Sequence, residues 1–194
     1  GGRAETVAPD GVPLVWVGRL MGARRMRRVC GPDLMPTLCE RSPARGYRHF
    51  FYGGAPGVAE RLAENLRTRF PGLAVAGTYA QPYRALSAEE DAAVVRLING
   101  SGADIVWVGL STPKQERWMA DHLGRIQAPV MLGVGAAFDV HAGAVRRAPP
   151  WMQRSGLEWL FRLLSEPRRL WRRYLVLAPK FVVLVVLQLL GLRR

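Results

Sequence analysis

The sequence predicts an α/β protein with a Rossmann-like, mostly parallel sheet flanked by helices, followed by a basic, amphipathic helical C-terminal appendage. Between residues 47 and 134, short apolar runs alternate with amphipathic helical patterns at the spacing of βαβ units. Basic residues then gather at the end of the chain, where residues 146–194 contain eleven Lys and Arg against two Glu. We therefore expect a core over residues 1–148 and an appendage over residues 149–194.

Four strands are expected, at residues 47–52, 73–76, 105–108 and 130–134. Helical patterns at residues 56–70 and 87–99 separate the first three, and Ser87 with Glu90 forms a capping-box signature at the start of the second helix. The run at residues 14–17 fits a strand or a helix equally well. Arg24, Arg25, Arg27 and Arg28 follow it, and we interpret this cluster as a solvated face.

The stretch from Ile105 to His122 joins a strand directly to a helix. Thr112 is expected to cap this helix, Pro113 to occupy its first position and Gln115 to complete a capping box. Lys114 and Gln115 then lie in the first helical turn, at the carboxyl end of a strand. Open α/β sheets bind their ligands at this edge, and helix N-termini favour anions.

The net charge of +13 indicates a negatively charged partner. The appendage has helical patterns at residues 151–164 and 167–177 and an apolar run at residues 181–192, which is shorter than the roughly 20 residues that span a bilayer. We interpret the appendage as an interfacial binder of an anionic membrane. The alternative is a set of helices that covers the sheet or an oligomer interface. Aromatic residues beside the apolar end of the appendage favour lipid over nucleic acid as its negatively charged partner.

Several functional classes lack their signatures. Cys30 and Cys39 have no metal-ligand spacing, the histidines have none to one another, and there is no Asp-x-Asp pair, so we expect no metal. Phe138 stands where a dinucleotide fingerprint needs its third glycine, so Gly133-Val134-Gly135 indicates a tight turn that lets a ligand approach the backbone. By residue type alone, Asp10 beside Gly11 is a turn former. Cysteine usage favours a reducing cytosol.

Ordered motifs along essentially the whole chain resemble the WecG/TagA/CpsF glycosyltransferase family. They are Pro9-Asp10-Gly11, Gly31-x-Asp33-Leu34, Gly109 to Glu116 with Trp118 and His122, Gly133 to Asp139, Arg147-Ala148-Pro149, Trp151-Met152-Gln153, Gly156 to Leu160 and Glu166 to Leu175.

The resemblance implies an inverting transferase that moves a sugar such as N-acetylmannosamine from a UDP-sugar to an undecaprenyl-diphosphate-linked sugar. Such enzymes make surface polysaccharides and teichoic-acid linkage units on the cytoplasmic face of the cell membrane. The UDP-sugar would be a substrate, and no cofactor is implied.

The same resemblance assigns roles to individual residues. It implies Asp10 as the catalytic base and Arg28, Gln115 and Asp139 as pocket residues, with Lys114 beside them. It implies that appendage arginines complete the site over the diphosphate, namely Arg168, Arg169, Arg172 and Arg173. The chemistry agrees, because a carboxylate can take the proton of an attacking hydroxyl and arginine forks bind phosphate oxygens.

The family pattern also includes a longer N-terminal region with a Thr and an Asn that contribute to the pocket, whereas this sequence begins shortly before Asp10. We therefore expect the first strand and helix of the sheet to be missing, which leaves a sheet edge open and the pocket incomplete. A catalytically inactive, membrane-docked UDP-sugar-binding fragment is the alternative to an active transferase. A homo-oligomer is left open.

Overall fold

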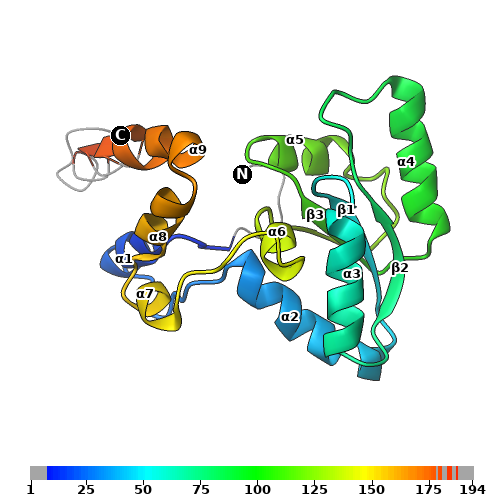
Figure 1. Ribbon diagram of the computed structural model, residues 1–194, viewed down its shortest axis with the longest axis horizontal. Helices are drawn as coiled ribbons and strands as arrows, with labels where there is room; N and C mark the ends of the chain where they lie inside the picture. Colours follow the sequence, from blue (N-terminus) through cyan, green and yellow to red (C-terminus); the bar gives the residue numbers. More distant parts are fainter. Residues whose placement is uncertain (1–7, 178, 181–182, 185–186, 188–194) are drawn as a thin grey trace. The chain divides into compact units, whose positions relative to one another are not determined.

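A computed structural model of the protein describes residues 8–177, 179–180, 183–184 and 187 (Figure 1). The chain divides into two compact units. The first contains residues 8–11 and 27–146, and the second contains residues 12–26 and the described part of 147–194. The helix α1 (Val12–Leu20) thus groups with the C-terminal helices. The predicted division into 1–148 and 149–194 stays a prediction.

The first unit is built on a four-stranded parallel sheet in the order β2-β1-β3-β4. Its strands are β1 (Arg48–Gly53), β2 (Ala74–Tyr79), β3 (Ile105–Gly109) and β4 (Val130–Gly133). Each overlaps a predicted run, although β2 continues three residues further than expected. The predicted α/β class is therefore confirmed.

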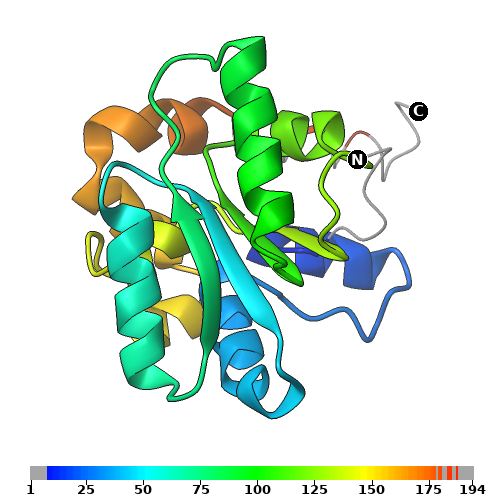
Figure 2. The same ribbon diagram turned by 90° about the vertical axis from the view of Figure 1, so that its right-hand side faces the viewer.

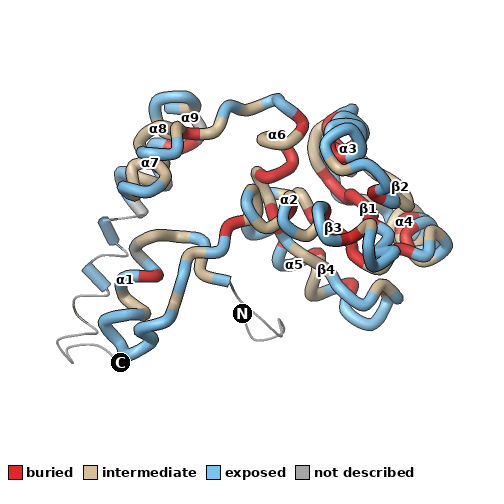
Figure 3. The backbone as a smooth tube through the Cα atoms, turned by 90° about the horizontal axis from the view of Figure 1, so that it is seen from below, coloured by how far each residue is buried: buried red, intermediate tan, exposed pale blue. Residues whose placement is uncertain are grey.

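Helices cover both faces of this sheet (Figures 1 and 2). On one face, α2 (Gly31–Arg41), α3 (Val58–Arg69) and α6 (Ala137–His141) pack on Phe51 and Trp107. On the other, α4 (Ala88–Gly100) and α5 (Lys114–Asp121) pack on Phe50, Tyr52 and Val106. Because alternate strand residues point to opposite faces, a strand buried on both faces is apolar throughout. This explains the apolar residues 50–52 and 105–108, and Figure 3 shows β1 and β3 as buried.

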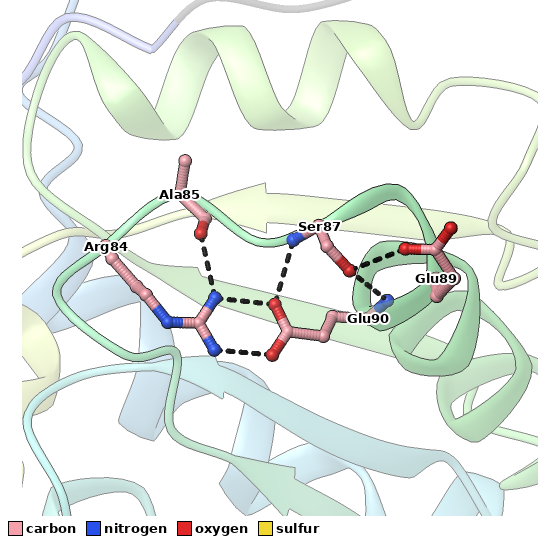
Figure 4. A network of polar contacts seen from close by, with 5 residues as sticks. All are labelled: Arg84, Ala85, Ser87, Glu89 and Glu90. Carbon is pink, nitrogen blue, oxygen red and sulfur yellow. Dashed lines mark hydrogen bonds and ion pairs between the residues drawn. The ribbon is translucent and has the colours of Figure 1, made fainter.

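The start of α4 has the predicted capping box. The Ser87 hydroxyl accepts a hydrogen bond from the Glu90 amide at 3.2 Å, and the Glu90 carboxylate accepts one from the Ser87 amide at 2.8 Å. Arg84 pairs with both carboxylate oxygens of Glu90 (Figure 4). These bonds hold the pKa of Glu90 at about 2, chiefly through Arg84. The segment after β2 is thereby attached to the first turn of α4.

The helix α2 was not predicted, because Pro32 and Pro36 obscure its pattern. Pro32 suits a first turn, but Pro36 has no amide hydrogen for the carbonyl four residues earlier, which belongs to Pro32. The ring nitrogen Nε2 of His141 on α6 lies 2.8 Å from that carbonyl oxygen and donates to it. Met35 and Cys39, one turn apart, are fully buried. A partner from α6 and two buried side chains therefore stabilise a helix that local propensity disfavours.

The second unit contains α1, α7 (Pro150–Arg154), α8 (Glu158–Ser165), α9 (Pro167–Trp171) and the π-helical turn η2 (Arg172–Leu177). The run at residues 14–17 thus forms a helix. The single helix predicted over residues 151–164 is wrong, because Gly156 at φ +76° ends α7. Within the described part of the chain, no helix is long and apolar enough to cross a membrane. The apolar run at residues 181–192 lies mostly outside that part.

Candidate active site

The strand order reverses between β1 and β3, which makes their carboxyl ends the expected ligand site of the sheet. The chain leaves β1 at Gly53 and Gly54, with φ values of +113° and +78°. The Gly54 amide donates to the Gly109 carbonyl at the end of β3, at 2.9 Å. A Cβ on Gly53 would lie 2.6 Å from the same carbonyl oxygen. The two loops therefore touch through their backbones, and only glycine fits at Gly53.

Gln115 connects the start of α5 to the loop after β4. Its side chain is 9% exposed, and its Oε1 accepts a hydrogen bond from the Gly135 amide at 2.8 Å. A Cβ on Gly133 would lie 2.5 Å from Gln115 Nε2, so the glycine makes room for this side chain. Because the Gly135 amide is a donor, the Gln115 carbonyl must face it. The amide nitrogen of Gln115 then makes no hydrogen bond to any described residue and remains a donor for a ligand.

The capping box predicted for α5 is wrong. The helix begins at Lys114, its N-cap is Pro113, and no side chain caps it. Thr112 donates instead to the Glu116 carboxylate at 3.0 Å. Gln115 cannot reach back to the cap because its carbonyl is bound to Gly135, a partner that the local sequence does not reveal. Lys114 is exposed in the first turn, as predicted.

Asp10 and Arg28 are brought together. Arg28 Nε donates to the backbone carbonyl of Asp10 at 2.6 Å, and Arg28 Nη2 lies 3.6 Å from Asp10 Oδ1. The Val29 amide also donates to the Pro9 carbonyl at 3.0 Å. The Asp10 side chain is 71% exposed and that of Arg28 26%, so the ion pair itself contributes little to stability. The arginine instead fixes the backbone that carries the carboxylate.

The segment that follows Arg28 packs against the same loop that Gln115 holds. A Cβ on Gly31 would lie 2.7 Å from the Val134 carbonyl oxygen. Gly31 begins α2 directly after Cys30, and Val134 precedes Gly135. A short series of contacts therefore links the Asp10–Arg28 pair, through the loop after β4, to Gln115. Three sequence motifs far apart in the chain meet at this loop.

Asp139 lies on α6, next to the aromatic side chain that covers the strand ends. A Cβ on Gly109 would lie within 2.4 Å of the Phe138 ring, and that ring packs edge-on against Phe51 at 6.1 Å between centroids. Asp139 is half-buried, and its backbone carbonyl accepts from the Ala144 and Val145 amides. The glycine at position 109 thus allows α6 to approach the sheet edge with Asp139 on it.

The four predicted arginines belong to the second unit. Arg168 and Arg172 are exposed, and the Arg172 guanidinium lies 5.8 Å from the centroid of the Trp171 ring. The side chains of Arg169 and Arg173 lie outside the described residues. No group of three or more potential metal ligands occurs among the residues that the structure describes.

A second polar cluster, which sequence reasoning missed, lies on the face covered by α4 and α5. Asp91 binds His122 Nε2 at 2.9 Å and Arg125 at 2.6 Å. Burial acts to raise the pKa of Asp91, but Arg125 and His122 outweigh it and lower the pKa. An open cavity of about 390 Å³ borders these residues. The spacing of 31 residues between Asp91 and His122 gives no local signal.

Trp118 and His122, two residues of the family motif, have a structural role here. Their rings stack at 4.0 Å between centroids, and Trp118 stacks on Tyr52 of β1 at 4.1 Å. Both are buried. This part of the motif fixes α5 on the sheet, and so fixes the position of Gln115 one turn earlier.

Comparisons with known proteins agree with the predicted resemblance. Residues 2–194 match the model of the glycosyl transferase WecG/TagA/CpsF family. A protein of Bacillus spizizenii, named N-acetylglucosaminyldiphosphoundecaprenol N-acetyl-beta-D-mannosaminyltransferase, is 36% identical over 183 residues, which cover 94% of this chain and 68% of that protein. A protein of the same name from Bacillus subtilis is 32% identical over 180 residues, or 93% of this chain and 68% of that protein.

Proposed function

Because the chain belongs to the WecG/TagA/CpsF family of glycosyltransferases, we propose that it transfers N-acetylmannosamine or a similar sugar from a UDP-sugar. The acceptor would be an undecaprenyl-diphosphate-linked N-acetylglucosamine, as the names of the two relatives state for those proteins. The product would serve surface polysaccharide or teichoic-acid synthesis. The observation that carries the proposal is that Gln115 and Gly31 both contact the loop after β4, and that Gly31 closely follows Arg28, which binds Asp10.

We assign the role of general base to Asp10. In an inverting transfer, the acceptor hydroxyl attacks the anomeric carbon while the bond from that carbon to the UDP oxygen breaks. The hydroxyl proton passes to the Asp10 carboxylate, and UDP leaves with the bonding electron pair. The exposure of this carboxylate supports the role, because an acceptor can reach it. Arg28 holds the Asp10 backbone and is a positioning residue.

The donor would bind along the carboxyl edge of the sheet. The exposed Lys114 and the first turn of α5 offer positive charge to the diphosphate. The amide nitrogen of Gln115 can donate to a sugar or phosphate oxygen, and the Asp139 carboxylate can accept from a hydroxyl. No cofactor or metal has a part in this assignment.

The acceptor accounts for the basic C-terminal helices. We propose that Arg168, Arg169, Arg172 and Arg173 bind phosphate oxygens of the lipid diphosphate, since bidentate guanidinium groups suit them. The exposed Trp151, Trp159 and Trp171 would lie at the headgroup level of an anionic membrane. The protein would then act as a peripheral protein on the cytoplasmic face.

The test measures sugar transfer to a polyprenyl-diphosphate-linked N-acetylglucosamine, with the anomeric configuration of the product determined by NMR. From an α-linked UDP-sugar the proposal predicts UDP release and a β-linked product. A retained α linkage would refute the inverting mechanism. Tight binding of UDP-sugar with no transfer would support instead the second hypothesis, a membrane-docked binding protein without catalysis.

A further inference from the structure

The helix α1 is apolar on nearly all sides, and yet half of its described residues are exposed. Seven of its nine residues are Val, Leu, Trp or Pro. Among the residues of α1 whose burial is described, only Val15 is buried, whereas Leu14 is 47%, Trp16 58% and Leu20 76% exposed. A helix that is apolar all round is ordinarily buried in a protein core or in a membrane. The surface of α1 therefore requires an apolar partner.

The chain after α1 turns back on the helix, and Leu14, Trp16 and Leu20 stay exposed. The turn is at Gly22, with φ +102°. Arg19 Nε donates to the Met26 carbonyl at 3.0 Å, and a Cβ on Gly18 would lie 2.4 Å from the Met26 sulfur. Met21, at the turn, is 63% exposed. Residues 12–26 thus form a hairpin closed by its own contacts, which we call the α1 hairpin.

Charge around the hairpin identifies the partner. Between Asp10 and Asp33 the sequence has no acidic residue and five arginines, at Arg19, Arg24, Arg25, Arg27 and Arg28. Arg24 and Arg25 are exposed beside the turn. An apolar surface bordered by arginines matches an anionic bilayer, whose acyl region accepts the apolar groups and whose headgroups neutralise the cations. The earlier interpretation of this cluster as a solvated face accounts for the charges but not for the apolar residues beside them.

The exposure of the tryptophan side chains also differs between the two units. Trp107 and Trp118 of the first unit are both buried. The four of the second unit are exposed by 41–62%, and they are Trp16, Trp151, Trp159 and Trp171. Tryptophan is enriched at membrane interfaces because one side of its ring is apolar and the other carries a donor. The α1 hairpin thus shares the surface chemistry of the C-terminal helices.

We propose that the α1 hairpin is a second membrane-binding element, which lies in the headgroup–acyl boundary of an anionic bilayer independently of the C-terminal helices. A nine-residue helix is about 13 Å long, so it lies in the interface and does not span the bilayer. The hairpin begins two residues after Asp10. Because consecutive Cα atoms are 3.8 Å apart, the Cα of Asp10 lies within about 8 Å of the first residue of α1.

Membrane insertion of the α1 hairpin has a consequence for sugar transfer, which rests on the proposed function. A lipid-linked diphosphate presents its sugar just outside the headgroup region. When the α1 hairpin is inserted, the covalent connection keeps the Cα of Asp10 within about 8 Å of the start of α1. Membrane docking then places the base where the acceptor hydroxyl is found, and binding of the bilayer and catalysis become linked through a single short segment.

The first test uses the full chain with Leu20→Cys carrying an environment-sensitive fluorophore. The native Cys30 and Cys39 are buried, so labelling favours the new thiol. Vesicles of phosphatidylcholine with phosphatidylglycerol should shift the emission to the blue, and vesicles of phosphatidylcholine alone should do so less. Tyr83→Cys, at a site 85% exposed in the first unit, is the matched control and should not shift.

The second test measures vesicle affinity by cosedimentation. Trp16→Glu with Leu20→Glu should weaken binding about tenfold or more, whereas Tyr83→Glu should not. Cosedimentation without a shift at position 20 would overturn the proposal, since the C-terminal helices would then suffice. An emission shift that grows with protein concentration in the absence of vesicles would indicate a second copy of the chain and would also overturn the proposal. An emission shift seen only with duplex DNA would overturn it as well. Neither test needs a sugar donor. A blue shift of the emission with vesicles, together with no sugar transfer, would therefore refute only the proposed function.

Discussion

Replacing Gln115 by methionine removes the side-chain hydrogen bond that ties α5 to the loop after β4. The Gly135 amide loses its acceptor at 2.8 Å and keeps only the longer contact to the Val108 carbonyl at 3.4 Å, in a site where the glutamine is only 9% exposed. Methionine has nearly the same volume, so the cavity contribution is small. Loss of one hydrogen bond costs about 0.5–1.5 kcal/mol. For a chain of this size, that corresponds to a fall in Tm of roughly 1–6 °C.

Thermal unfolding followed by circular dichroism measures this fall. Gln127→Met is the control, because Gln127 is an exposed glutamine and should change the Tm little. The same variant should bind UDP-sugar more weakly, since it also lacks the donor nitrogen. A wild-type Tm for Gln115→Met would refute the inference that this bond stabilises the loop. Weaker binding with an unchanged Tm would leave Gln115 as a ligand contact alone.

Three further predictions concern the core and a helix cap. His49 is fully buried, and burial lowers its pKa to about 4, so only the unfolded state gains this proton between pH 6.5 and 4. Stability should therefore fall by roughly 2 kcal/mol from pH 7 to pH 5, and urea unfolding should show a smaller fall for His49→Phe. Ser87→Ala should destabilise the protein by about 1 kcal/mol through loss of the α4 cap, measured by the same unfolding. Burial raises the pKa of Cys30 to about 11 and of Cys39 to about 12, so both thiols should react with a disulfide reagent only on unfolding; fast reaction in the native protein would contradict their burial.

The sheet was predictable because its signals are local. The apolar run at residues 105–108 comes from a strand buried on both faces, and the Ser87–Glu90 capping box is contained within four residues. The helix α2 was not predictable, since the group that compensates for Pro36 is His141, more than 100 residues away. The same holds for Gln115, whose partner is 20 residues further along the chain.

The membership of the candidate site stays a prediction, and its arrangement could not be read from the sequence. Motif resemblance predicted Asp10 and Arg28 as site residues, but only the structure shows that the arginine binds the aspartate backbone. It also separates members of one motif by role, since Gln115 lies at the loop while Trp118 stacks on the sheet. The apolar character of residues 14–17 was visible, but their helical conformation and exposure were not.

The most direct test of the account is the rate of sugar transfer to the lipid-linked acceptor by Asp10→Asn relative to the unchanged chain. Asparagine keeps the shape of the side chain and the backbone carbonyl that Arg28 binds, but it cannot take the proton. We expect the rate of transfer to fall by about 10²–10⁴-fold, while donor binding is retained. The control variant Asp121→Asn, which changes an exposed carboxylate on α5, should transfer sugar at the original rate. Transfer by Asp10→Asn at a rate close to that of the unchanged chain would contradict the assignment of Asp10 as the base.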